Sequence, residues 1–252
     1  MVSIPFLRAW IKRNKRNTDL WEVETDRYIP RISAALDRLK PALDMSQQIP
    51  SGPFSEPLSM EQTIAYHLAL FARNGTIVVD QLLDNVGLLW SQGRMVGVSG
   101  LIRFALEYWA AVNFGLGILN AMQSGLDIQK AGEKAARLTF SGKTPVKLPW
   151  GGTTNNVAYS VLTFIDGLKG VEPEARDFYD FLCEASHPNF LQNTYFIMAS
   201  RRYTNFSNES FEAHAHELLN KNIEIAEKAA AGMARDVAAI LEKTLPMFSK
   251  LR

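Results

Sequence analysis

The sequence predicts an all-α fold, a helical bundle of about seven to nine helices with long central helices. Apolar residues recur at steps of three, four and seven over several long segments, which is the period of an amphipathic helix. No segment keeps up the period-two alternation that is typical of a strand. No tandem repeat and no low-complexity tract interrupts the helical pattern.

Residues 1–17 are expected to form a basic N-terminal arm ahead of a single helical domain of residues 18–252. The arm carries +5 and no acid, so the whole-chain charge of +1 leaves −4 for the remainder. As a helix the arm would be amphipathic, which suits a membrane surface, an acidic partner or nucleic acid. We favour the alternative, an arm that Trp10 packs onto its own domain or onto a second subunit.

The composition is that of an ordinary soluble globular protein, with 47% apolar and 21% charged residues. A chain of 252 residues can bury a sizeable core. A single cysteine, Cys183, excludes an internal disulfide and a Cys-rich zinc site, which fits a reducing compartment. Because the N-terminus lacks the uninterrupted apolar stretch of a secretory signal, the expected location is cytoplasmic.

The first long helix is expected over residues 19–48, followed by a loop over 48–58 that is rich in proline. Pro30 and Pro41 are expected to kink or divide this helix, because proline lacks the backbone donor that a helix interior needs. Its apolar residues are Trp21, Tyr28, Ile32, Leu36, Leu39 and Leu43.

A second long helix is expected over residues 60–92. Ser59 and Gln62 have the spacing of a capping box, which marks its beginning. The residues expected to face the core are Ile64, Leu68, Phe71, Val78, Leu82, Val86 and Leu89.

The third long helix, expected over residues 94–124, contains the most apolar long segment and is expected to lie in the core. Arg103 and Glu107 lie four residues apart in it, which places them on one helix face. Four polar residues interrupt the apolar run of 95–122, so we interpret it as a buried helix rather than a membrane span. Three glycines near its beginning suit close approach of a neighbouring backbone: Gly93, Gly97 and Gly100.

Shorter helices are expected next. One covers residues 131–140 and is followed by a loop over 142–152. The helix after that loop carries apolar residues from Val157 to Leu168 and ends at Gly170; its cap would be Thr153, Thr154 or Asn155.

The last third of the chain begins with a helix over residues 174–186, which Pro173 opens. A short helix over 189–199 and an irregular connection over 201–208 are expected to follow. The final helix, over 211–243, is long and amphipathic, with Ala215, Leu218, Ile225, Ala229, Val237 and Leu241 on one side.

The segment YDFLCEASHPN (179–189) offers the best candidate site. Helical spacing places Phe178, Phe181, Leu182 and Ala185 on a core stripe, with Tyr179, Cys183, Ser186 and His187 on an adjacent polar stripe. Histidine is the natural proton-transfer group near neutral pH, and the helix dipole favours its charged form at a helix C-terminus. The alternative is a histidine that caps its own helix.

If Arg103, Glu107 and His187 converge, they form a plausible acid–base site. Arg103 would bind a phosphate or carboxylate, Glu107 would orient His187, and His187 would act as general acid or base. The alternative is a buried Arg–Glu–His network that fixes helix packing.

Arg103-x-x-x-Glu107 followed by Tyr179-x-x-Leu182-x-x-x-x-His187 resembles the motifs of a family of uncharacterised bacterial helical proteins. Members carry R-x-x-x-E and a later Y-x-x-L-S-x-x-x-H, and Cys183 replaces the serine here. The resemblance covers residues 93–189. That family is similar to abortive-infection and HEPN-type proteins, some of which are metal-independent ribonucleases. Those ribonucleases have an arginine and a histidine close together on one helix, whereas the nearest arginine before His187 is Arg176.

A di-iron carboxylate site is a remote alternative. Glu184 and His187 have the spacing of such bundles, and Glu61 and Glu107 could add ligands, but the second Glu-x-x-His that these sites need is missing. We therefore expect no metal and no cofactor.

The sequence favours a non-catalytic interaction or ligand-binding protein with a buried Arg–Glu–His network. The second hypothesis is a HEPN-like, abortive-infection or toxin-type protein that acts on RNA or a nucleotide through His187 and Arg103. The partners considered are a second copy in a homo-oligomer, RNA or a nucleotide, and an acidic partner for the basic arm; no membrane span is expected.

Overall fold

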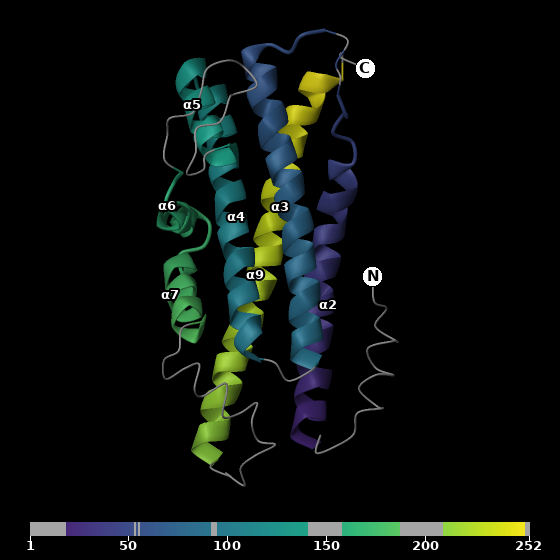
Figure 1. Ribbon diagram of the computed structural model, residues 1–252, viewed down its shortest axis with the longest axis vertical. Helices are drawn as coiled ribbons and strands as arrows, with labels where there is room; N and C mark the ends of the chain where they lie inside the picture. The colour runs from purple at the N-terminus through teal and green to yellow at the C-terminus, as the bar shows by residue number, and fades with distance from the viewer. Residues whose placement is uncertain are drawn as a thin grey trace. The chain divides into compact units, whose positions relative to one another are not determined.

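The structure is a computed structural model that describes residues 19–52, 54, 56–91, 95–140, 158–186 and 209–249 (Figure 1). Side chains are described from residue 27 in the first helix, from 97 in the third long helix and from 216 in the last. Several predicted features lie outside the described residues: the arm of 1–17, the loop of 142–152, the segments 189–199 and 201–208, and His187.

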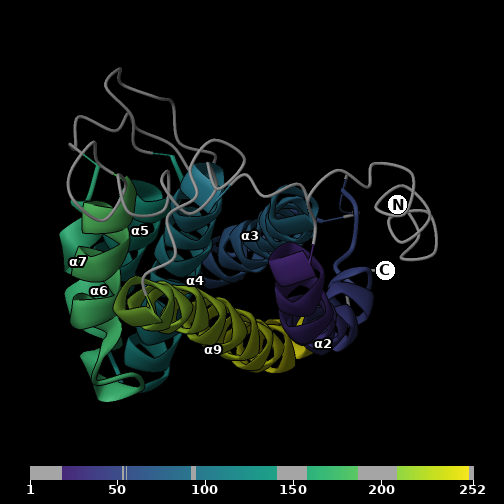
Figure 2. The same ribbon diagram turned by 90° about the horizontal axis from the view of Figure 1, so that it is seen from below.

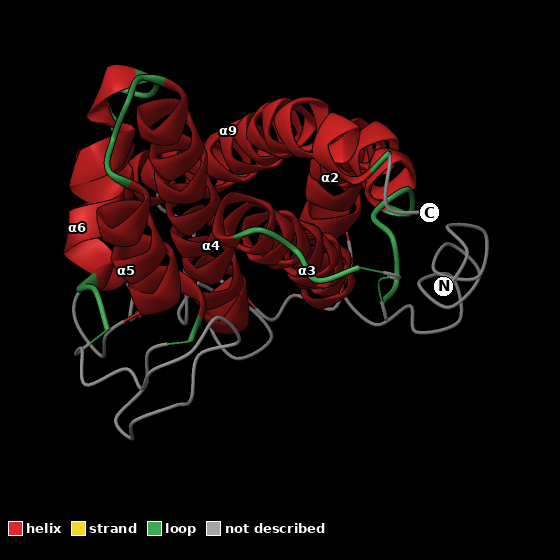
Figure 3. Ribbon diagram, turned by 90° about the horizontal axis from the view of Figure 1, so that it is seen from above, coloured by secondary structure: helices red, strands yellow, loops and turns green. Residues whose placement is uncertain are grey.

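The described residues form helices and loops and contain no strand (Figure 3), so the all-α prediction is confirmed. Seven α-helices lie in the described ranges, the lower end of the predicted number. With one short 3-10 helix they are α2 (Asp19–Ser46), α3 (Met60–Ser91), α4 (Met95–Gln123), α5 (Ile128–Thr139), α6 (Val161–Gly167), η1 (Leu168–Gly170), α7 (Ala175–Ser186) and α9 (Glu209–Phe248).

The capping box predicted for the second long helix is confirmed. The backbone N–H of Ser59 donates to Oε1 of Gln62 at 2.9 Å, and the N–H of Gln62 donates to Oγ of Ser59 at 3.2 Å. The two residues thereby satisfy two backbone donors that the helix itself leaves without partners. α3 accordingly begins at Met60.

α4 ends at Gln123, within one residue of the predicted end. Gly125 has a φ of 93°, a left-handed conformation that glycine adopts without steric cost. The N–H of Leu126 donates to the carbonyl of Ala121 at 2.8 Å, and that of Gly125 donates to Met122 at 3.1 Å. This pair of hydrogen bonds is a Schellman motif, which reverses the chain before α5.

α2 is one continuous helix of 28 residues, so Pro30 and Pro41 do not divide it, which was one of the two expected outcomes; the other, a kink, stays a prediction. Both prolines are exposed, whereas one side of the helix is fully packed. The backbone hydrogen bond lost at each proline is therefore offset by burial of the other side. Its buried apolar residues are Tyr28, Ile32, Ala35, Leu39 and Ala42.

Three other boundaries differ from the prediction because of caps and C-terminal packing. α5 begins at Ile128 rather than 131, since the Asp127 side chain accepts from the N–H groups of residues 129 and 130. α6 begins at Val161 and is capped by Ser160, so the predicted caps at 153–155 are wrong. α9 runs on to Phe248, which is buried.

The buried side of α3 differs in part from the predicted stripe. Phe71, Val78, Leu82 and Leu89 are half-exposed. The core positions are taken mostly by neighbouring and smaller residues: Ile64, Ala65, Leu68, Ala69, Ala72, Thr76, Val79, Leu83, Val86 and Trp90.

The chain divides into two compact units, and α2, α3, α4 and α9 each contribute residues to both. Unit 1 comprises residues 1–37, 79–106 and 177–230. Unit 2 comprises residues 38–78, 107–176 and 231–252. That residues 18–252 form a single domain stays a prediction.

In unit 1, α7 packs beside α4 and α9 (Figure 2). The rings of Tyr28 and Trp90 lie 5.1 Å apart and join α2 to α3. The buried Ser99 hydroxyl of α4 donates to Oδ1 of Asn222 of α9 at 3.0 Å. The close approach predicted at Gly100 is absent, because a Cβ there would meet no atom within 4 Å.

In unit 2, aromatic contacts join the end of α9 to α3 and to the loop before α3. The ring of Tyr66 lies 5.1 Å from Phe54 and 5.8 Å from Phe248. The ring of the adjacent residue, His67, lies 5.0 Å from Phe140, directly after α5. These contacts hold the helix ends of unit 2 to one another.

Candidate functional site

Arg103, the predicted anion-binding residue, contacts Tyr179 in unit 1. Nη2 of Arg103 donates to the Tyr179 hydroxyl at 3.2 Å. The guanidinium carbon also lies 5.2 Å from the centre of the tyrosine ring, which is within the range of a cation–π interaction. Two of the four predicted site residues therefore meet, one from α4 and one from α7.

The surroundings of the two residues differ. Arg103 is half-buried, although Ile102, Ala105 and Leu106 around it are fully buried. Tyr179 is 5% exposed, so it belongs to the packed side of α7 rather than to the polar stripe predicted for it. Because the hydroxyl of a buried tyrosine needs a partner, the arginine donor compensates its burial.

The rest of α7 agrees in part with the predicted faces. Phe178, Leu182 and Ala185 are buried as predicted, whereas Phe181 is half-exposed. The Ser186 hydroxyl donates to the carbonyl of Leu182 at 2.6 Å, so it serves its own helix.

Cations face all three aromatic side chains of α7. Nζ of Lys228 lies 4.6 Å from the ring centre of Phe178, and Nζ of Lys221 lies 5.1 Å from that of Phe181. Both lysines come from α9, whereas Arg103 comes from α4 and faces Tyr179. Each such contact contributes about 0.5–1 kcal/mol at exposed sites, so the row helps to hold α7 in place.

Two further predicted site residues are Glu107 and His187. Glu107 is half-buried and belongs to unit 2. His187 lies outside the described residues, directly after the last residue of α7. The convergence of Arg103, Glu107 and His187 therefore stays a prediction.

The candidates for metal binding and thiol chemistry gain no support. Among the described residues, no group of three or more His, Cys, Asp or Glu side chains could hold a metal ion. Glu61 and Glu184, two of the proposed di-iron ligands, are exposed. Cys183 is half-buried and free.

His67 lies among aromatic side chains of unit 2, as expected for a core histidine. Its ring contacts Phe140, and Tyr66 lies 5.7 Å away. Burial lowers the pKa of His67, because a half-buried imidazolium loses hydration that the neutral ring does not need.

A second polar cluster, at Asp236 in unit 2, was not predicted from the sequence. Oδ2 of Asp236 accepts from Nε1 of Trp109 and from Nδ2 of Asn113, each at 2.9 Å, and Oδ1 accepts from Nε of Arg235 at 2.8 Å. The Asp236 side chain is 2% exposed. The signal in the sequence was the pair Trp109 and Asn113, four residues apart in the apolar helix.

Within the described ranges, no helix combines the length and apolar character needed to span a bilayer.

Comparison with known proteins gives no match, whether with family models, curated proteins or solved structures.

Proposed function

We propose that this protein is a non-catalytic interaction protein that associates through the exposed face of α4 in unit 1. That face, here called the α4 face, consists of Gly97, Gly100, Leu101 and Phe104. Steps of three, one and three residues keep these positions on one side of a helix. The α4 face carries no charge, and it is half-exposed or exposed throughout.

The observation that carries this proposal is the exposure of Phe104. The side chain is 51% exposed, the most of any large apolar residue among the described ones. It stands beside Gly100, where a Cβ would meet no atom within 4 Å, so a second helix backbone has room to come close, whereas Leu89 fills the space over Gly97. A contiguous uncharged face of this kind is a common site of helix–helix association.

The contact of Arg103 with Tyr179 supports a structural role for the arginine next to Phe104. A guanidinium that stacks on a buried ring and donates to its hydroxyl fixes α7 against α4. In this proposal the Arg–Glu–His set of the sequence prediction serves packing, and the partner is a second copy of the chain.

The test is the oligomeric state of Phe104→Glu, measured by sedimentation velocity over a range of concentrations. Wild type should self-associate, and the variant should be monomeric because a charge cannot be buried at a helix–helix contact without large cost. Leu88→Glu is the matched control, since Leu88 is an exposed apolar residue of unit 1 on α3, 37% exposed. A monomeric wild type, or equal effects of both variants, would contradict the proposal.

A second candidate function is action on RNA or a nucleotide by a HEPN-like, abortive-infection-type protein through Arg103 and His187. The observation in its favour is that α7, which leads directly to His187, already contacts Arg103 through Tyr179. Arginine is suited to a phosphate, and histidine to proton transfer.

This second function predicts that His187→Ala abolishes RNA cleavage while the melting temperature stays within about 1 °C of wild type. RNA cleavage is measured with a fluorescent oligonucleotide and the melting temperature by circular dichroism. His216→Ala is the control, because His216 lies on α9 outside the predicted set. Absence of cleavage by wild type, or a marked loss of stability in His187→Ala, would leave the structural role of His187 as the better explanation.

A further inference from the structure

The buried cluster at Asp236 includes a steric element as well as hydrogen bonds. Gly232 lies four residues before Asp236 on α9, on the same face. A Cβ at Gly232 would lie 2.6 Å from Nε1 of Trp109 and still closer to two of its ring carbons. No side chain fits there, so the indole of Trp109 occupies space that only glycine leaves open.

The hydrogen bonds and the glycine act on the same indole. Trp109 fills the space above Gly232, and its N–H reaches Asp236 one turn further along α9. Asn113, one turn after Trp109 on α4, donates to the same carboxylate oxygen. Two consecutive turns of α4 are thereby matched to two consecutive turns of α9.

We propose that these four residues, Trp109, Asn113, Gly232 and Asp236, are a register lock that fixes the axial position of α4 against α9 in unit 2. A shift of one helical turn, about 5.4 Å, would bring the indole against a residue that has a Cβ. The same shift would separate the buried carboxylate from its two α4 donors, which is costly for a charge.

Small residues make such a lock useful in this part of the fold. α4 carries the buried Ala110 and Ala111 beside the cluster, whereas Ala234, Ala238 and Ala239 of α9 are half-exposed. The two buried alanines of α4 give little shape to distinguish one register from the next. A polar contact that forms in one register alone supplies the missing specificity, as buried polar residues do in coiled coils.

The lock makes a prediction that a purely stabilising cluster does not. Apolar residues often replace buried charged groups without loss of stability. The triple variant Trp109→Leu, Asn113→Leu, Asp236→Leu should therefore stay folded, with a melting temperature within about 5 °C of wild type. It should, however, populate more than one register.

Pulsed electron spin resonance between labels at residues 120 and 242 measures the register directly. Asn120 of α4 and Glu242 of α9 are exposed residues of unit 2, and Cys183→Ser removes the native thiol. Wild type should give one distance, and the triple variant should give a second population. Thr76→Val is the control, because the buried Thr76 hydroxyl donates to Ala72 of its own helix at 2.8 Å. It should keep the wild-type distribution.

Two results would overturn the lock. One is a triple variant that keeps the single wild-type distance; the other is a triple variant that does not fold, which would make the cluster a source of stability instead. Gly232→Ala provides an independent check. It should lower the melting temperature by at least about 5 °C, and Trp109→Leu should recover part of that loss in the same chain. Additive effects of the two substitutions would also contradict the proposal.

Discussion

Arg103 shows how a charged side chain persists in the most apolar helix of the protein. Arg103 is half-buried, so it keeps part of its hydration, and its guanidinium carbon lies 5.2 Å from the centre of an aromatic ring. Its donor also satisfies the hydroxyl of the buried Tyr179. Arginine suits this position better than lysine, because its flat cation can stack on a ring and donate at the same time.

His67 gives a pH dependence whose sign follows from its surroundings. Burial lowers the pKa of His67 in the folded protein below its value of about 6.5 in the unfolded chain. Below that pH the unfolded chain binds a proton that the folded protein does not, so stability falls as pH decreases. The loss grows until the pH reaches the folded pKa, below which it stays constant.

His67→Phe should weaken this acid sensitivity because phenylalanine keeps the ring contacts with Tyr66 and Phe140 but cannot be protonated. The measurement is the difference in melting temperature between pH 8 and pH 5.5, in the variant and in wild type. His216→Phe serves as the control histidine. An unchanged difference in His67→Phe would show that other groups set the acid sensitivity.

Asp236 shows what sequence patterns do not reveal at single residues. An isolated aspartate beside Arg235 in a charged helix is usually solvated, and its neighbours along α9 carry no sign that this one is buried; the signal lies on α4, in Trp109 and Asn113. Its burial depends on Gly232 and Trp109, which are brought together by the tertiary packing of α4 on α9. Arg103 and Glu107 can be recognised as a pair because they lie close together in sequence. The buried Asp236, in contrast, has partners 123 and 127 positions away.

At the scale of elements, the sequence predicted two helix ends well, whereas it predicted the buried faces of helices less well. The capping box at Ser59 and the end of α4 follow from a few adjacent residues, and both are predicted well. The predicted buried face of α3 is correct at Ile64, Leu68 and Val86. It is wrong at large residues such as Phe71 and Leu82, which are half-exposed while Ala72 and Thr76 are buried. Periodicity of large apolar residues misses core positions where close helix packing needs small ones.

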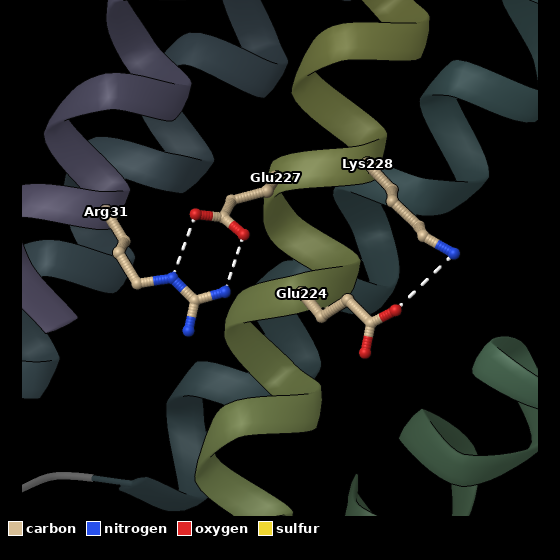
Figure 4. Close-up of polar contacts among 4 residues, drawn as sticks. All are labelled: Arg31, Glu224, Glu227 and Lys228. Atoms are coloured by element: carbon tan, nitrogen blue, oxygen red, sulfur yellow. Dashed lines mark hydrogen bonds and ion pairs between the residues drawn. The ribbon is translucent and has the colours of Figure 1, made fainter.

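In unit 1, a bidentate ion pair between Arg31 and Glu227 joins α2 to α9 (Figure 4). Nε and Nη2 of Arg31 donate to the two carboxylate oxygens of Glu227 at 2.9 and 2.6 Å. This hydrogen bonding raises the pKa of Arg31 and outweighs the effect of burial. The arginine side chain is 35% exposed and that of the glutamate 23%, so solvent screens part of the attraction.

A double-mutant cycle of Arg31→Met and Glu227→Gln should give a coupling of about 1 kcal/mol, the upper range for partly exposed pairs, because the geometry is bidentate. The free energies come from urea unfolding. The control pair is Lys228 and Glu224 on α9, at 3.4 Å, for which we expect about 0.3–0.5 kcal/mol. Equal coupling energies for the two pairs would show that the ion pair between α2 and α9 stabilises the protein no more than an ion pair within α9.

At the scale of the whole molecule, the fold class was predictable and the site was only partly so. Amphipathic periods over long segments determine an all-helical chain whatever the details of packing. Arg103 and Tyr179 were each predicted as site residues, but their contact was not predicted, and the structure places the tyrosine in the packed side of α7. Whether helices α4 and α7 turn particular side chains toward each other depends on tertiary packing, which single-sequence patterns do not contain.

The central claim is that Arg103 holds α7 against α4, and a double-mutant cycle between Arg103 and Tyr179 tests it most directly. The variants Arg103→Met and Tyr179→Phe remove the cation and the hydroxyl while keeping the apolar bulk of each side chain. In urea unfolding we expect each to destabilise the protein and the pair to show a coupling of about 1 kcal/mol from the hydrogen bond alone, because phenylalanine keeps the ring beside the guanidinium. Effects that add within about 0.3–0.5 kcal/mol would contradict the claim.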